Sequence, residues 1–105
     1  MAFRLAEDWE PWAAGKVRYL RRREVGQAAE SGIWRGNAHD IPPGTPIRYK
    51  RNEYIYIISG GLKLEMDSGE IYQLEPGDCF GFAKGETVKW TLTSDELEEF
   101  YVYHD

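Results

Sequence analysis

Short apolar runs that alternate with turn sequences constrain the fold of this chain more than any other feature. The runs are rich in β-branched and aromatic residues, which favour strands. Glycine and proline mark the turns between them, and no stretch has a convincing helical period. The turns fall at positions 60–61, 67–70, 75–78 and 84–86, with an acidic bend at 94–99 before a final strand that starts at Phe100. This spacing predicts an all-β protein, a sandwich or a barrel.

Alternation within the run 53–58 predicts which side chains face the interior. Successive residues of a strand point to opposite faces, so Glu53 should point inward with Ile55 and Ile57. The opposite face carries Tyr54, Tyr56 and Ile58. An apolar outer face usually needs cover, so we expect a homodimer that uses this sheet.

Length and composition fit a single domain. The chain has 105 residues, which leaves no room for a second core, and its 42% apolar and 14% aromatic residues supply enough bulk for one. We expect residues 1–30 to form an N-terminal arm and an outer strand between Val17 and Val25. Residues 31–105 should form the barrel.

Charge is divided unevenly along the chain. The net charge is −5, but residues 1–51 hold ten Lys and Arg against six acids, whereas residues 52–105 hold three against twelve. The basic run 21–23 is followed at once by Glu24. Binding to nucleic acid depends on a sustained positive field, so we expect no nucleic-acid partner.

The sequence carries no mark of export or membrane insertion. Acidic residues at positions 7, 8 and 10 interrupt the N-terminus, and no apolar run reaches the length needed to cross a bilayer. The lone Cys79 cannot form an internal disulfide. We therefore expect a cytoplasmic protein with no membrane partner.

Two spacings resemble the paired motifs of cupins. Six residues separate Glu53 from Gly60, as at the end of the first cupin motif, and Gly77-Asp78 followed by Lys84-Gly85 resembles the second. From Ser31 to Val102 the chain is similar to the small single-domain cupins grouped with ureidoglycine aminohydrolase and ethanolamine-utilisation proteins. The matching positions are Gly32-Ile33-Trp34, Tyr49, Glu53 to Gly60, Pro76-Gly77-Asp78, Lys84-Gly85, Trp90 and Tyr101-Val102.

The resemblance implies a double-stranded β-helix barrel of the jelly-roll, RmlC-like type, often dimeric, with a pocket between its sheets. In metal-binding cupins the first motif carries two histidines and a glutamate, and the second carries a third histidine. Glu53 matches the glutamate. The histidine positions fall here on Ile47 and Tyr49, or on Pro46 and Arg48 with the other permitted gap, and on Val88.

This donor set argues against a metal. A divalent metal needs about four donor atoms from imidazoles and carboxylates, and only one matching donor remains. The two histidines of the chain, His39 and His104, are expected at the surface. We therefore expect no cofactor and no tightly bound metal.

This pattern singles out Glu53 as the candidate functional residue, because a buried carboxylate needs a partner or a raised pKa. Arg48 and Tyr49 are its expected partners. An apolar, aromatic wall is expected around it from Trp34, Phe82, Val88, Trp90 and Tyr101. Two bland alternatives stay open: Glu53 anchors a neighbouring strand, and the aromatic residues simply fill the core.

Three functions follow from these residues. The first is binding of a small polar or anionic metabolite, in which Glu53, Arg48 and Tyr49 make polar contacts and Trp90 stacks on the ligand. Glu53 is then also a candidate general acid or base, so the sequence leaves open whether the protein is an enzyme. The second is a metal-dependent hydrolase of the ureidoglycine aminohydrolase type. The third is a non-enzymatic interaction module.

Overall fold

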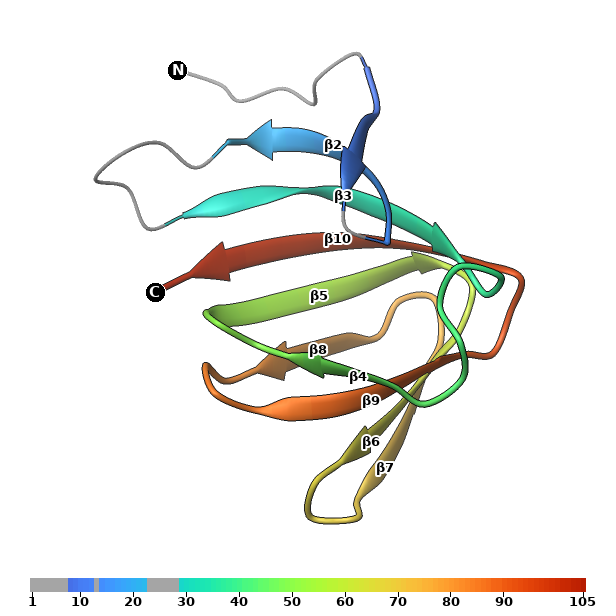
Figure 1. The fold of residues 1–105 in the computed structure, drawn as a ribbon. Helices are drawn as coiled ribbons and strands as arrows, with labels where there is room; N and C mark the ends of the chain where they lie inside the picture. The colour runs from blue at the N-terminus through green and yellow to red at the C-terminus, as the bar shows by residue number, and fades with distance from the viewer. Residues whose placement is uncertain (1–7, 13, 23–28) are drawn as a thin grey trace.

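A computed structural model describes residues 8–12, 14–22 and 29–105 of the chain. The described residues form strands and no helix, in two antiparallel sheets that face each other (Figure 1). The larger sheet has the order β1-β2-β3-β10-β5-β8 and the smaller has the order β4-β9-β6-β7. The strands are β1 Glu10–Trp12, β2 Gly15–Arg21, β3 Glu30–Asn37, β4 Thr45–Arg48, β5 Asn52–Ser59, β6 Leu62–Met66, β7 Ile71–Leu74, β8 Cys79–Phe82, β9 Thr87–Leu92 and β10 Glu96–His104. The predicted all-β, double-stranded β-helix architecture is confirmed.

The N-terminal hairpin extends the larger sheet. Strand β2 pairs with β3, and β1 pairs with β2 as the outermost strand (Figure 1). The expected outer strand is therefore present, but it ends at Arg21, and Val25 lies outside the described residues. Much of the expected N-terminal arm, residues 1–7, also lies outside them.

Strand β10 begins earlier than the sequence pattern predicted. The expected bend at 94–99 is wrong, because β10 starts at Glu96 and pairs along its length with β3. The acids at 96 and 98 take the outer side of the strand, where Glu98 accepts a hydrogen bond of 2.7 Å from Arg35 on β3. Leu97 and Glu99 take the inner side and are buried. A row of acids was thus mistaken for a solvated loop.

The core lies between the two sheets and follows the predicted alternation. Leu62 and Leu64 on β6 and Val88, Trp90 and Leu92 on β9 are buried from the smaller sheet. On the larger sheet the inward residues include Ile55 and Ile57 of β5, together with Trp34, Phe82, Leu97 and Tyr101. The cavity described below also lies between the two sheets.

The outer face of β5 is apolar and exposed, as alternation predicted. Tyr54, Tyr56 and Ile58 are 54%, 44% and 38% exposed. No described helix is long and apolar enough to cross a membrane. The homodimer and the cytoplasmic location stay predictions.

Candidate functional site

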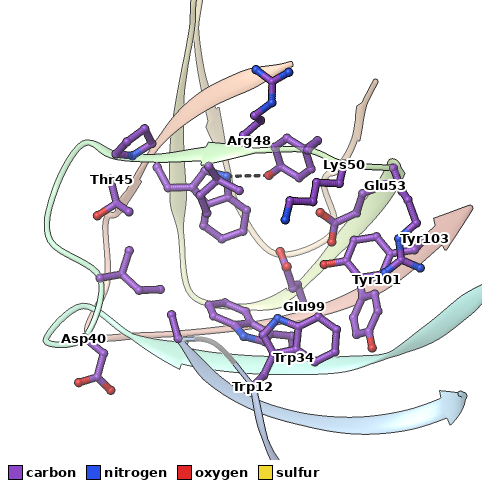
Figure 2. Close-up of a pocket in the computed structure, with 17 residues that line it drawn as sticks. Trp12, Trp34, Asp40, Thr45, Arg48, Lys50, Glu53, Glu99, Tyr101 and Tyr103 are labelled. Atoms are coloured by element: carbon purple, nitrogen blue, oxygen red, sulfur yellow. Dashed lines mark hydrogen bonds between the residues drawn. The ribbon is translucent and has the colours of Figure 1, made fainter. Parts of the chain in front are cut away.

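A cavity of about 620 Å³ opens between the sheets. Its walls come from β1, β3, β5 and β10 of the larger sheet, from β4 and β9 of the smaller, and from the segments on either side of β4 (Figure 2). The lining residues are Trp12, Ala14, Trp34, Asp40, Ile41, Thr45, Pro46, Ile47, Arg48, Tyr49, Lys50, Arg51, Glu53, Trp90, Glu99, Tyr101 and Tyr103.

The structure brings together most of the residues singled out from the sequence. The six that line the cavity are Trp34, Arg48, Tyr49, Glu53, Trp90 and Tyr101. The two that do not are Phe82 and Val88, which are fully packed in the core. The ring of Phe82 stacks on that of Tyr49 with centroids 4.2 Å apart, so it supports the cavity wall from behind.

Glu53 points into the cavity and is only 5% exposed. Burial raises the pKa of its carboxyl from 4.5 to about 8, against the opposing effects of a hydrogen bond with Tyr103 and the positive charge of Arg51. Tyr103 lies directly opposite Glu53 in the β10–β5 pairing. The groups that favour the ionised form of Glu53 are thus Tyr103, beside it on the neighbouring strand, and Arg51, rather than the expected Arg48 and Tyr49.

A second carboxyl, that of Glu99, lines the same cavity from β10. It is 3% exposed, and its Oε2 atom is buried without a hydrogen-bond partner. Burial, followed by the charge of Glu53, raises the pKa of Glu99 well above its ordinary value. In the register of the sheet Glu99 lies opposite Trp34 on β3, so an indole flanks the carboxyl. Figure 2 shows the carboxyls of Glu53 and Glu99 directed toward the same space.

Sequence reasoning missed Glu99 because it was counted with the acidic bend. Glu99 lies two residues from both Leu97 and Tyr101, which are buried, so strand alternation places it on the same inner face. That alternation is the signal that would have identified it. Trp12 was also missed as a wall residue. It packs against Tyr101 and Tyr103 at centroid distances of 5.8 and 6.1 Å, and nothing in its short, poorly patterned segment indicated that contact.

The polar groups of the aromatic wall are largely bonded to each other. Trp90 Nε1 donates a hydrogen bond of 2.9 Å to the hydroxyl of Tyr49. The hydroxyl of Tyr101 donates one of 2.9 Å to the buried carboxylate of Glu30, behind the wall. Burial raises the pKa of both tyrosines, so both stay neutral phenols at any ordinary pH.

Three cationic residues, Arg48, Lys50 and Arg51, stand at the rim. Arg48 and Lys50 are exposed, and in Figure 2 Arg48 points away from the cavity while Lys50 points toward the two carboxyls. The guanidinium of Arg51 lies over the ring of Tyr103, 4.7 Å from its centroid, and its Nη1 atom is buried without a hydrogen-bond partner. The interior is thus acidic and the rim basic.

The sequence profile of the EutQ-like cupin domain matches residues 26–101. This chain belongs to that family. No curated protein matches the sequence. The DUF861 family protein of Thermotoga maritima shares 26% identity with this cupin at a TM-score of 0.57, over 66% of this chain and 73% of its own.

More distant cupin structures show the same fold. The EutQ protein of Clostridium difficile is 16% identical with a TM-score of 0.65, covering 86% of this chain and 68% of that one. Ectoine synthase from P. lautus is 21% identical with a TM-score of 0.74, covering 92% and 68%. At these identities the likeness concerns the fold alone.

The donor set of this cupin does not fit the metal site of metal-binding cupins. The cavity wall offers the carboxyls of Glu53, Glu99 and Asp40, and neither histidine of the chain lines it. His39 is exposed, and His104 stacks on Tyr54 on the outer face. Among the described residues no three His, Cys, Asp or Glu side chains are grouped so that they could hold an ion. The site of metal-binding cupins draws most of its donors from histidines, and no histidine lines this wall.

Proposed function

We propose that this cupin binds a small organic molecule in the cavity between its two sheets, without a tightly bound metal. The observation that carries the proposal is the pair of buried carboxyls, Glu53 and Glu99, on the wall of an open cavity of about 620 Å³. Ligand sites are typically cavities of this size with apolar walls and a few converging polar groups.

Core filling alone does not account for this arrangement. An interior that served only packing would hold apolar side chains, because burying carboxyls without full hydrogen bonding costs stability. Here the inner wall keeps two acids, and Glu99 Oε2 has no partner. Polar groups held at such a cost are typical of sites that meet a ligand.

Glu53 also has the properties of a proton donor. Its pKa of about 8 keeps most of the carboxyl protonated at neutral pH, and general acids work best with a pKa near the working pH. The alternative of a metal-dependent hydrolase rests on family likeness, but the cavity lacks the histidine ligands that such an enzyme would need. The alternative of an interaction module rests on the exposed apolar face of β5.

Tryptophan indole signals offer a direct test of binding. The chain has four tryptophans, of which Trp12, Trp34 and Trp90 line the cavity and Trp9 does not. We expect small molecules that bind to shift the three cavity indole signals in a ¹H–¹⁵N NMR spectrum and leave that of Trp9 in place.

A matched pair of variants distinguishes the cavity from the surface. Ile47 lines the cavity, so Ile47→Trp should fill it and abolish the shifts. Ile71 is 55% exposed on β7 of the same sheet, so Ile71→Trp should leave them unchanged. Binding that survives Ile47→Trp, or a fragment library that shifts none of the three signals, would refute the proposed function.

A further inference from the structure

The chemistry of the cavity wall also indicates which class of molecule it takes, provided that the proposed function holds. We infer that the ligand is an organic cation, a compound that carries a protonated amine or a related cationic nitrogen beside an apolar body. Three independent features of the wall support this: an acceptor without a donor, an aromatic enclosure, and a separation of charge between interior and rim.

The first feature is the imbalance of hydrogen-bonding groups in the interior. Glu99 Oε2 is buried and accepts no hydrogen bond. Two donors of the wall are already used, because the indole of Trp90 donates to Tyr49 and the hydroxyl of Tyr101 donates to Glu30. A ligand that satisfies the ionised form of Glu99 must therefore bring a donor, and a cationic nitrogen makes the strongest hydrogen bonds to a carboxylate.

The second feature is the aromatic enclosure around the carboxyls. Trp34 and Trp90 meet edge to face with centroids 5.9 Å apart. Trp12 stacks on Tyr103 with centroids 6.1 Å apart. Tryptophan and tyrosine faces attract cations through their ring quadrupoles, and the attraction is strongest where water is excluded. Aromatic walls next to carboxylates thus favour a cation over a neutral or anionic molecule of the same shape.

The third feature is the placement of the charged side chains. The cations of the rim do not neutralise the interior equally. Arg48 is exposed and points outward, so water screens it. The guanidinium of Arg51 lies over the face of Tyr103, although its buried Nη1 atom has no hydrogen-bond acceptor. Lys50 is the exception: its side chain extends toward Glu53 and Glu99 (Figure 2). The ammonium group of Lys50 thus lies near the position that we assign to the cationic end of the ligand.

Binding of a cation must be linked to proton release. The pKa of Glu53 is raised to about 8 and that of Glu99 is raised well above its ordinary value, and a nearby cation favours the ionised forms of both carboxyls. Affinity for a cation should therefore rise with pH between about 6 and 8. The titratable and charged groups that face these two carboxyls are Glu30, Asp40, Arg48, Tyr49, Lys50, Arg51, Tyr101 and Tyr103.

Three probes of one shape test the class of ligand. Phenethylamine, 2-phenylethanol and 3-phenylpropanoate present the same ring with a cationic, a neutral and an anionic end. We expect phenethylamine to bind about tenfold or more tightly than the other two at pH 7.5, as read from the indole shifts, which corresponds to about 1.4 kcal/mol. Calorimetry in buffers of different ionisation enthalpy should detect the released protons.

Variants at Glu99 and Lys50 test whether the first side chain favours, and the second opposes, binding of a cation. Glu99→Gln should remove the preference for phenethylamine, whereas Glu96→Gln, the same change at an exposed position of β10, should keep it. Lys50→Met should strengthen phenethylamine binding several-fold, because it removes the internal competitor.

The outcomes separate this inference from the proposed function. Equal binding of the three probes, tighter binding of 3-phenylpropanoate, or an unchanged preference in a folded Glu99→Gln variant would overturn the cation assignment and leave ligand binding in place. Failure of every probe to shift the three cavity indole signals would overturn the cation assignment as well. Failure of the wider fragment library too would remove the proposed function with it.

Discussion

Tyr49 and Trp90 are joined across the smaller sheet by a buried hydrogen bond of 2.9 Å from the indole Nε1 to the phenol oxygen. Tyr49 occupies one of the positions at which metal-binding cupins are expected to carry a histidine. Here the side chain is a structural member of the wall. Loss of its hydroxyl leaves a buried N–H without an acceptor, so Tyr49→Phe should lower the free energy of unfolding by about 1–3 kcal/mol. Chemical denaturation measures the change.

Tyr56→Phe is the control for this prediction, because the hydroxyl of Tyr56 belongs to a side chain that is 44% exposed on the outer face. We expect that variant to lie within about 0.5 kcal/mol of the parent. If Tyr49→Phe is as stable as Tyr56→Phe, the bond contributes nothing and the wall is held by stacking on Phe82 alone.

The buried acids make stability depend on pH in a direction opposite to that of most carboxylates. The folded-state pKa of Glu53 is raised from 4.5 to about 8, and that of Glu99 is raised well above 4.5, so the unfolded chain loses these protons first. Their protonation supports the fold at pH 4.5 and below. As pH rises from about 4.5 to 8, stability should fall by up to about 1.4 kcal/mol per pH unit through Glu53, and Glu99 should add to the fall in the same direction. Denaturation midpoints across that range measure the slope.

Glu53→Gln keeps the shape of the side chain and removes its titration. We expect the variant to be more stable than the parent above pH 8 and to have a shallower slope, the remainder belonging to Glu99. Glu75→Gln, at an exposed turn position, should leave the slope unchanged. A parent whose stability rises steadily from pH 5 to 8 would contradict the assignment of two protonated, buried carboxyls.

The position of Glu53 could be predicted because strand alternation is a strict geometric rule. In a strand every second residue shares a face. The spacing from Glu53 to Gly60 identified this strand as the end of the first cupin motif. The exposed face of Tyr54 and Tyr56 followed from the same rule. The all-β fold class followed from turn residues and alternation, which are local properties of a single sequence. The family followed from the resemblance of the two motif spacings to those of cupins.

The partners of Glu53 could not be predicted, because they depend on which strands become neighbours. Tyr103 meets Glu53 only through the β10–β5 pairing, between segments far apart in the chain. The burial of Glu99 could not be predicted from the acidic run 95–99, because such runs are usually solvated. Only the pairing of β10 with β3 places Glu99 on the inner face. Trp12 reaches the cavity through a hairpin whose sequence has no clear period.

The motif glycine Gly60 is required for two reasons that can be separated by experiment. Its φ of 85° is unfavourable for other residues, and a Cβ there would collide with the backbone oxygen of Glu96. Gly77 has a φ of 96° but open space around a Cβ. Gly77→Ala should therefore cost about 1–2 kcal/mol, and Gly60→Ala at least about 3 kcal/mol. Equal losses in thermal or chemical denaturation would rule out the collision.

The outer face of β5 yields the last prediction, that two copies associate through it. Tyr54, Tyr56 and Ile58 are exposed together, and beside them a shallow groove of about 340 Å³ runs across β5, β8 and β10. Gly81 leaves room for the ring of Tyr54 in that groove, because a Cβ there would collide with the ring. We propose a second copy of the chain as the occupant, since a two-fold contact buries the same apolar residues from both sides.

Sedimentation at micromolar concentration tests this association. The parent should sediment as a dimer, and Ile58→Lys should shift it toward the monomer by tenfold or more in the dissociation constant, roughly 1.4 kcal/mol, because the charge enters the contact twice. Ile71→Lys, on the more exposed β7 of the other sheet, is the matched control and should leave the dimer intact. A parent that is monomeric at these concentrations would remove the dimer, and with it the reason given for an apolar face on this side of the sheet.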